Sequence, residues 1–167
     1  MPQAMMMSKI YNTGEYGRHN LAPKTINIME EIKLNHDIRV LCVKAPSFPE
    51  GIQEAFDRLH ALIPFTTNQN FFGISRPEPS ENGAIVYRAG IEEKEEDQAK
   101  RLGTEVILLR KGKYITQKVT DYQDDPTLIA RAFEELLQYP DLDPDGYCVE
   151  WYTQGEKSVK CMVRLHS

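Results

Sequence analysis

Apolar and polar positions along the chain change their period repeatedly, which predicts an alternation of strands and helices. Apolar residues that recur every three or four positions predict helices over about 49–63 and about 126–138. Pro49 and Pro126 suit the first turns of these helices, and Asp125 is a candidate N-cap for the second. The charged segment 92–100 is predicted to be a solvated linker or a short helix. Alternating or continuous apolar runs predict strands near 26–32, 38–45, 70–76, 84–92, 105–109, 114–119, 147–153 and 159–166.

One of these helical patterns occurs twice, 77 residues apart (position 52 against position 129). Ile52-x-x-Ala55-Phe56 is repeated as Ile129-x-x-Ala132-Phe133, and strands follow each copy at the same offset. An internal repeat constrains the architecture before any motif is considered. We expect two strand–helix–strand–strand units, repeat one over about 38–92 and repeat two over about 104–166.

The repeat predicts an α+β fold in which both units pair their strands into one curved antiparallel sheet. Both helices are expected to cover one face of the sheet, with a ligand groove on the other face near the pseudo-twofold axis. Residues 24–167 are interpreted as a single domain. Residues 1–23 have no periodicity and are rich in polar residues and glycine, so we interpret them as a flexible arm.

Composition and charge narrow the possible functions. A hydrophobic content of 41% and a charged content of 27% are ordinary for a soluble globular protein. The net charge of −5 argues against nucleic acid as the main partner. No apolar run is long enough to span a membrane, and the start of the chain lacks the features of a signal peptide, so we expect a cytoplasmic location without membrane contact.

Glu150 is the most informative polar residue, because it interrupts the apolar strand near 147–153. Alternation places Tyr147, Val149 and Trp151 on one face of that strand and Cys148, Glu150 and Tyr152 on the other. If the first set packs against the helices, Glu150 points into the groove. A carboxylate among aromatic rings can pair with a cationic ligand, or it can act as an acid or base. The alternative is a surface glutamate on a solvated sheet face.

Aromatic residues on neighbouring strands and loops are candidate walls for such a site. Together with one acid they suit a bulky hydrophobic cation, although aromatic strand residues also belong to cores. The candidates for ligand binding are Glu150, Tyr152, Tyr87, Tyr114, Phe48 and Phe71.

Motifs for other chemistries are missing from the sequence. The three cysteines are widely spaced in apolar runs, and the four histidines lack metal-ligand spacing, so neither a disulfide framework nor a metal site is predicted. No nucleophile elbow, phosphate loop, dinucleotide fingerprint or helix-turn-helix is recognisable. We therefore expect no cofactor, and we assign no catalytic residue beyond Glu150, should the protein be an enzyme.

The order of these features resembles the GyrI-like small-molecule-binding domain, also called the AraC-type effector-binding domain, over about residues 26–166. The resemblance lies in Pro46 and the first helix, the strand Tyr87-Arg88-Ala89-Gly90-Ile91, the turn at Gly112-Lys113-Tyr114, the second helix, and Glu150-Trp151-Tyr152, which is similar to the E-x-Y signature of the family. The resemblance implies a duplicated sheet with a central groove, a pocket glutamate at Glu150, and bulky, often cationic, aromatic ligands. Many members are fused to DNA-binding domains and act as drug-sensing regulators, and some relatives hydrolyse strained electrophiles.

The chain departs from this family pattern in three places. No DNA-binding domain is recognisable, so the resemblance does not imply direct control of transcription. Arg88 stands where the family tends to have an acid, which places a cation near the predicted site. The segment 120–124 lacks the glycine-containing turn usual before the second helix, so we expect the pocket rim to differ.

Three hypotheses of function follow. The first is a stand-alone protein that binds a bulky hydrophobic, cationic small molecule through Glu150. The second is a hydrolase that opens a strained electrophilic ring, with Glu150 activating water and Tyr114 or Tyr152 donating a proton. The third is an inhibitor or interaction protein that contacts a protein partner through the arm and the acidic segment 92–97.

Overall fold

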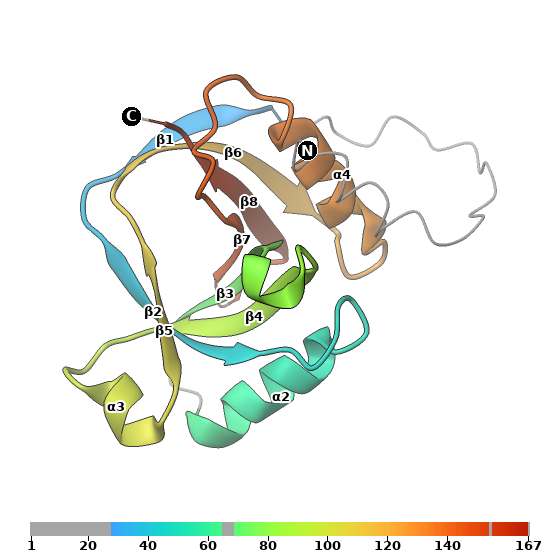
Figure 1. Ribbon diagram of the computed structural model, residues 1–167. Helices are drawn as coiled ribbons and strands as arrows, with labels where there is room; N and C mark the ends of the chain where they lie inside the picture. Colours follow the sequence, from blue (N-terminus) through green and yellow to red (C-terminus); the bar gives the residue numbers. More distant parts are fainter. Residues whose placement is uncertain (1–27, 65–68, 154, 167) are drawn as a thin grey trace.

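The computed structural model describes residues 28–64, 69–153 and 155–166, and these form one curled antiparallel sheet with helices packed on its outside (Figure 1). The predicted arm and the start of the first predicted strand lie outside the described residues. The strands are β1 (Glu30–Leu34), β2 (Ile38–Lys44), β3 (Asn70–Pro77), β4 (Ile85–Glu92), β5 (Glu105–Leu109), β6 (Gly112–Thr120), β7 (Cys148–Thr153) and β8 (Ser158–Arg164). The helices are α2 (Ile52–Leu62), α3 (Gln98–Leu102) and α4 (Thr127–Leu136), with a 3-10 turn, η1, at Pro79–Glu81. The predicted α+β fold with a curved sheet and two long helices is confirmed.

The order of strands in the sheet is β1-β6-β8-β7-β3-β4-β2-β5, and every neighbouring pair is antiparallel. Elements of the two halves take equivalent places about the central pair β3 and β7: β4 matches β8, β2 matches β6, and β5 matches β1 at the opposite edge. In the central pair Gly73 lies directly opposite Glu150. These two residues also correspond in the sequence repeat, so the pseudo-twofold axis passes between them.

The helices cover the outer face of the curl, α2 over β2 and β4, and α4 over β6 and β8. On α2, Ala55 and Leu59 are fully buried and pack with Leu41, Ala89 and Ile91 of the sheet. On α4, Ala132, Phe133 and Leu136 pack in the same way. Burying these apolar stripes removes their surface from water, which is the main force holding each helix on the sheet.

The inner face of the sheet has a core of its own, because the sheet curls around it. Phe72, Ile74, Val149 and Met162 are each at most 1% exposed, and they pack together with Val40 from β2. The sheet is thus apolar on both faces, so hydrophobicity alone does not show which face of a strand the helices cover.

Local sequence explains where the helices begin and end. The carboxylate of Asp125 accepts hydrogen bonds from the backbone N–H of Thr127 at 3.2 Å and from its hydroxyl at 2.5 Å, which supports the start of α4. The charged segment after β4 contains the short helix α3, which ends at Gly103 with a φ of +65°. None of the helices in the described ranges is both long and apolar enough to cross a membrane.

Candidate functional site

Glu150 lies at the centre of the sheet, on the face covered by the helices. Tyr152 and Cys148, which share its face of β7, pack with the core beneath α4, whereas Tyr147, Val149 and Trp151 pack with the core of the inner face. The expectation that Tyr147, Val149 and Trp151 pack against the helices is therefore wrong, and Glu150 does not open into the inner face. Its carboxylate instead lies under the outer layer, on the pseudo-twofold axis between α2 and α4.

The carboxylate of Glu150 is buried, and its partners among the described residues are uncharged. The residue is 6% exposed, and its Oε2 accepts hydrogen bonds from the hydroxyls of Tyr87 at 2.9 Å and Tyr152 at 2.6 Å. Among the residues that the structure describes, no cationic side chain pairs with it, and Oε1 accepts no hydrogen bond. Burial raises the pKa of Glu150, while the hydroxyls of Tyr152 and Tyr87 oppose that rise by stabilising the carboxylate.

Gly73 makes the space that this carboxylate occupies. A Cβ atom at position 73 would lie 2.1 Å from the hydroxyl oxygen of Tyr87 and 2.4 Å from Oε2 of Glu150. Neither distance is compatible with van der Waals contact, so a side chain at this position excludes the observed arrangement. Glu150 in one half of the repeat therefore requires glycine at the equivalent position, Gly73, in the other half.

Aromatic rings surround the two tyrosine hydroxyls. The ring of Phe48 stacks on Tyr87 with centroids 5.7 Å apart, and Phe56 of α2 lies 6.5 Å from Tyr87 and 6.3 Å from Tyr152. Tyr122, in the loop between β6 and α4, lies 5.6 Å from Tyr152. We call Phe48, Phe56, Tyr87, Tyr122 and Tyr152 the aromatic cluster. Ring faces attract cations, so this cluster and Glu150 favour the same class of ligand.

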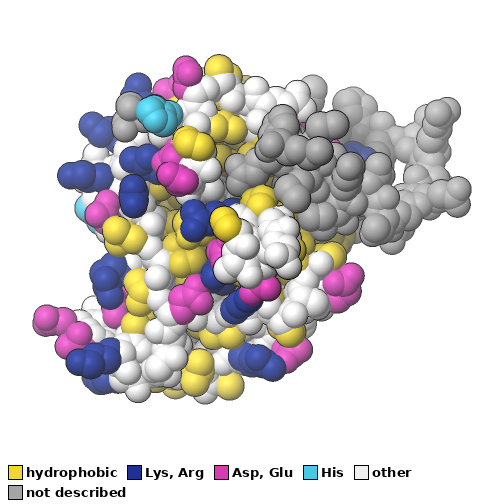
Figure 2. All heavy atoms as spheres, in the orientation of Figure 1, with side chains coloured by type: hydrophobic (Ala, Val, Ile, Leu, Met, Phe, Trp, Pro, Cys, Tyr) yellow, Lys and Arg dark blue, Asp and Glu magenta, His cyan; other side chains and the backbone are white. Residues whose placement is uncertain are grey.

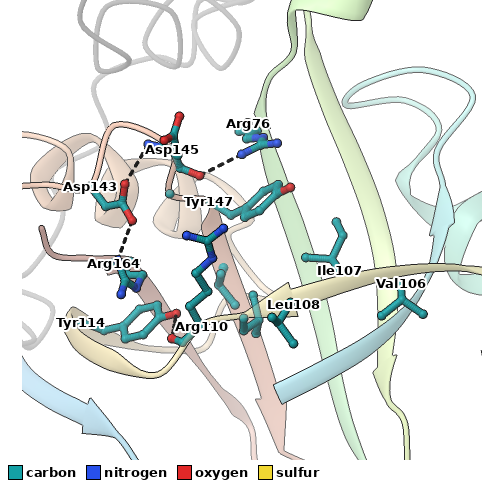
Figure 3. A pocket seen from close by; sticks show the side chains of 13 residues that line it. Arg76, Val106, Ile107, Leu108, Arg110, Tyr114, Asp143, Asp145, Tyr147 and Arg164 are labelled. Carbon is teal, nitrogen blue, oxygen red and sulfur yellow. Dashed lines mark hydrogen bonds and ion pairs between the residues drawn. The ribbon is translucent and has the colours of Figure 1, made fainter. Parts of the chain in front are cut away.

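The structure brings together most of the residues predicted for the site. Tyr87, Tyr152 and Phe48 belong to the aromatic cluster, and Phe71 lies on the same face, opposite Tyr152 in the β3–β7 register and 5.5 Å from the ring of His60. Tyr114 does not join them. It faces the inner core, where its hydroxyl donates a hydrogen bond to the backbone oxygen of Arg110 at 2.7 Å (Figure 3).

Two members of the aromatic cluster were missed by sequence reasoning. Phe56 was interpreted as part of the apolar stripe of the first helix, and its equivalent in the repeat, Phe133, is indeed buried in the core. Tyr122 belongs to the segment 120–124, where the chain departs from the family pattern. That departure was the available signal, and it places an additional aromatic ring beside Tyr152.

The cation expected next to the site lies elsewhere. Arg88 follows Tyr87 on β4, and it is paired with Glu78 at 2.6 Å and with Glu105. Both partners lie away from Glu150, so Arg88 does not neutralise the buried carboxylate. His60 does not do so at neutral pH either, because burial lowers its pKa.

Other kinds of site find little support in the described part of the chain. No group of three or more histidine, cysteine or acidic side chains there could hold a metal ion. The face shown in Figure 2 has basic side chains interspersed with acidic ones, so it offers no continuous basic surface. The expectation that nucleic acid is not a partner stays a prediction.

Comparisons with known proteins find the fold but not a sequence family. No protein-family model matches the chain, and no curated protein matches it. Among solved structures, the integron cassette protein VCH_CASS2 from the mobile metagenome of Vibrio cholerae has a TM-score of 0.59 at 14% identity, over 83% of this chain and 95% of its own.

Two further structures share the fold at similar distance. SAV2435, solved bound to tetraphenylphosphonium, has a TM-score of 0.53 at 14% identity, over 82% of this chain and 94% of its own. A hydrolase encoded by lin2189 from Listeria innocua has a TM-score of 0.53 at 9% identity, over 84% of this chain and 92% of its own. These likenesses show a common fold, and they are consistent with the GyrI-like architecture.

Proposed function

We propose that the chain is a GyrI-like small-molecule-binding protein whose ligand is a bulky hydrophobic cation. The observation that carries this proposal is the carboxylate of Glu150, buried among aromatic rings without a cationic partner in the described residues. Burying an unpaired charge is costly, so a ligand that supplies the opposite charge relieves that cost. The fold shared with a protein solved bound to tetraphenylphosphonium supports the same class of ligand.

Glu150 and the aromatic cluster have different roles in this site. The hydroxyls of Tyr87 and Tyr152 hold the carboxylate in place through Oε2, which leaves Oε1 to face the charge of a ligand. The aromatic cluster supplies flat apolar surface against which phenyl groups can pack. A ligand with a delocalised positive charge fits both parts, because it is more easily desolvated than a compact ammonium ion.

The direct test is calorimetric titration with tetraphenylphosphonium and with the neutral triphenylphosphine oxide. We expect the wild-type protein to prefer the cation, and Glu150→Gln to weaken cation binding about tenfold or more while leaving the neutral compound unchanged. Glu54→Gln removes an exposed carboxylate on α2 and serves as the matched control. Equal binding of the cation by wild type and Glu150→Gln would refute the proposal.

Phe56 is expected to contribute to affinity through its ring. Phe56→Ala removes a half-buried ring that contacts both Tyr87 and Tyr152, so we expect tetraphenylphosphonium to bind roughly threefold to thirtyfold more weakly. Leu62→Ala, an exposed apolar position on the same helix, is the control and should bind normally. A Phe56→Ala protein with wild-type affinity would exclude this ring from the site.

Hydrolysis is the second candidate, and the raised pKa of Glu150 favours it, since a carboxylate with a raised pKa is a stronger base. In such a reaction Glu150 takes a proton from water, the hydroxide forms a bond to a ring carbon, and the carbon–oxygen bond breaks as Tyr152 protonates the leaving oxygen. Burial raises the pKa of Tyr152, so this hydroxyl is protonated before the step and gives up its proton only to the strongly basic alkoxide that ring opening forms. Turnover of an epoxide such as styrene oxide by wild type, lost in Glu150→Gln, would favour the hydrolase.

A further inference from the structure

A separate cavity of about 430 Å³ opens on the inner face of the sheet, on the side away from the helices (Figure 3). It lies between β5, the ends of β6 and β8, and the loop that precedes β7. Neither Glu150 nor any member of the aromatic cluster lines it. Its volume is within the range of small-molecule sites.

The walls of this cavity combine apolar and aromatic surface. Ile107, Leu109 and Val149 belong to the inner core and form its apolar part. Tyr147 and Tyr114 add two aromatic rings from different strands and loops. Ile107, Leu109, Val149 and Tyr114 are each at most 6% exposed, so of these five residues the half-buried ring of Tyr147 leaves the most surface for a flat apolar body.

Three arginines line the cavity, and two of them already have partners. Arg164 pairs with Asp143 at 2.7 Å, and its second terminal nitrogen donates to the backbone oxygen of Lys111 at 3.1 Å. Arg76 lies 4.0 Å above the ring of Tyr147 and donates to the backbone oxygen of Asp145 at 2.8 Å. Glu78 lies 3.9 Å from Arg76.

Arg110 is the remaining cation. Within the described ranges of the chain it has no carboxylate at ion-pair distance, in contrast to Arg76 and Arg164. Figure 3 shows its side chain rising from the end of β5 into the cavity, toward Tyr147. With Asp143, Asp145 and Glu78, the three arginines are balanced by three carboxylates among the described residues, but none of these carboxylates lies at ion-pair distance from Arg110.

The backbone beside Arg110 is fixed by contacts from several elements. The hydroxyl of Tyr114 donates to the backbone oxygen of Arg110 at 2.7 Å, and Asp37 accepts from the backbone N–H of Lys111 at 2.7 Å. Burial works against the charge of Asp143, but the backbone N–H of Asp145 and the guanidinium of Arg164 together hold the pKa of that carboxyl below its usual range. The ion pair beneath Arg110 therefore persists at neutral pH and leaves Arg110 as the available charge.

We propose that this inner cavity is a second binding site, for a small organic anion with a flat apolar body, such as an aromatic carboxylate. Its carboxylate pairs with the guanidinium of Arg110, which presents a planar fork of donors suited to that group. Its apolar body lies against Leu109, Val149 and the ring of Tyr147. The site is independent of Glu150, because the two lie on opposite faces of the sheet.

The test uses 2-naphthoate as the probe, with 2-naphthamide as its neutral analogue and inorganic phosphate as an anion without an apolar body. We expect calorimetry to show that wild type prefers 2-naphthoate over both. Arg110→Met keeps the aliphatic stem and removes the charge, and it should weaken 2-naphthoate binding about tenfold to a hundredfold. Arg101→Met, which removes an exposed arginine on α3, should bind 2-naphthoate normally.

Two crossed measurements separate this inference from the proposed function. Glu150→Gln should leave 2-naphthoate binding unchanged, and Arg110→Met should leave tetraphenylphosphonium binding unchanged. Undetectable 2-naphthoate binding at millimolar concentration, equal binding by wild type and Arg110→Met, or a preference for phosphate would each overturn the inference. If binding of 2-naphthoate depends on Arg110, the inference of a second site is upheld even if tetraphenylphosphonium does not bind. Thermal unfolding followed by circular dichroism establishes that Arg110→Met is folded.

Discussion

Replacing Gly73 with alanine is expected to abolish binding of tetraphenylphosphonium and to lower the free energy of unfolding by about 1–3 kcal/mol. The new methyl group would overlap the hydroxyl of Tyr87 and the carboxylate of Glu150, at 2.1 and 2.4 Å. Both groups must move for the chain to fold, and the hydrogen bond that joins them is lost with the movement. The measurements are calorimetric titration and urea unfolding.

Gly90→Ala is the matched control, since it also adds a methyl group to a strand interior. Its Cβ would lie 2.4 Å from Cγ1 of Val40, in the inner core. We expect a comparable loss of stability but retained binding of the cation by the folded protein. The double variant Gly73→Ala, Tyr87→Phe removes the closest clashing atom and should recover part of the stability. Normal cation binding by Gly73→Ala would show that the carboxylate is not in the site.

The affinity for the cation is expected to depend strongly on pH. Burial raises the pKa of Glu150, so the apoprotein holds a proton at pH values where an exposed glutamate has released it. A bound cation favours the ionised carboxylate and expels this proton. The affinity for tetraphenylphosphonium should therefore rise with pH, by up to about tenfold per pH unit below the raised pKa, and level off above it.

The stability of the apoprotein should change in the opposite direction. In the unfolded chain the glutamate titrates near pH 4.3. Above that pH, and up to the raised pKa in the folded state, the folded protein binds more protons than the unfolded chain. This group's contribution to stability is thus fully present below about pH 4.3 and is lost as the pH rises through the window, by up to about 1.4 kcal/mol per pH unit.

Glu150→Gln provides the control for both pH profiles. The variant cannot ionise at this position, so its cation affinity and this part of its stability should not change across the same window. Calorimetry in buffers of different ionisation enthalpy should also detect release of a proton on binding to wild type but not to the variant. A cation affinity that falls as the pH rises would contradict the assignment.

Most of the architecture could be predicted from the sequence, because the apolar residues recur with a clear period in the helices and the repeat relates the two halves. The repeat, with its offset of 77 residues, identifies equivalent positions in the two halves. Gly73 and Glu150 are one such pair, and the structure places them opposite each other at the centre of the sheet. The helices α2 and α4 follow from their apolar stripes, with Asp125 at the start of the second.

The face on which Glu150 lies could not be predicted in the same way. Alternation divides β7 into two sets of residues, but both sets are apolar apart from Glu150, since one packs under the helices and the other fills the inside of the curl. Hydrophobicity does not distinguish two buried faces. Tyr114 was assigned to the wrong group for the same reason.

Local sequence patterns could not predict the inner cavity either. Arg110 lies in the short connection between β5 and β6, where a charged residue is ordinary. Its surroundings come from the loop before β7 and from Arg164 at the end of β8, which lie more than thirty positions away along the chain. Only the curl of the sheet brings these groups together.

The pairing of Gly73 with Glu150 also bears on how the two halves must be connected. A homodimer built from two identical halves would place the same residue on both sides of its symmetry axis. Two glutamates there would repel each other and compete for one space, and two glycines would leave no acid at all. Joining the halves in one polypeptide lets each side carry a different residue, so the covalent link permits a broken symmetry and limits the site to a single ligand per molecule.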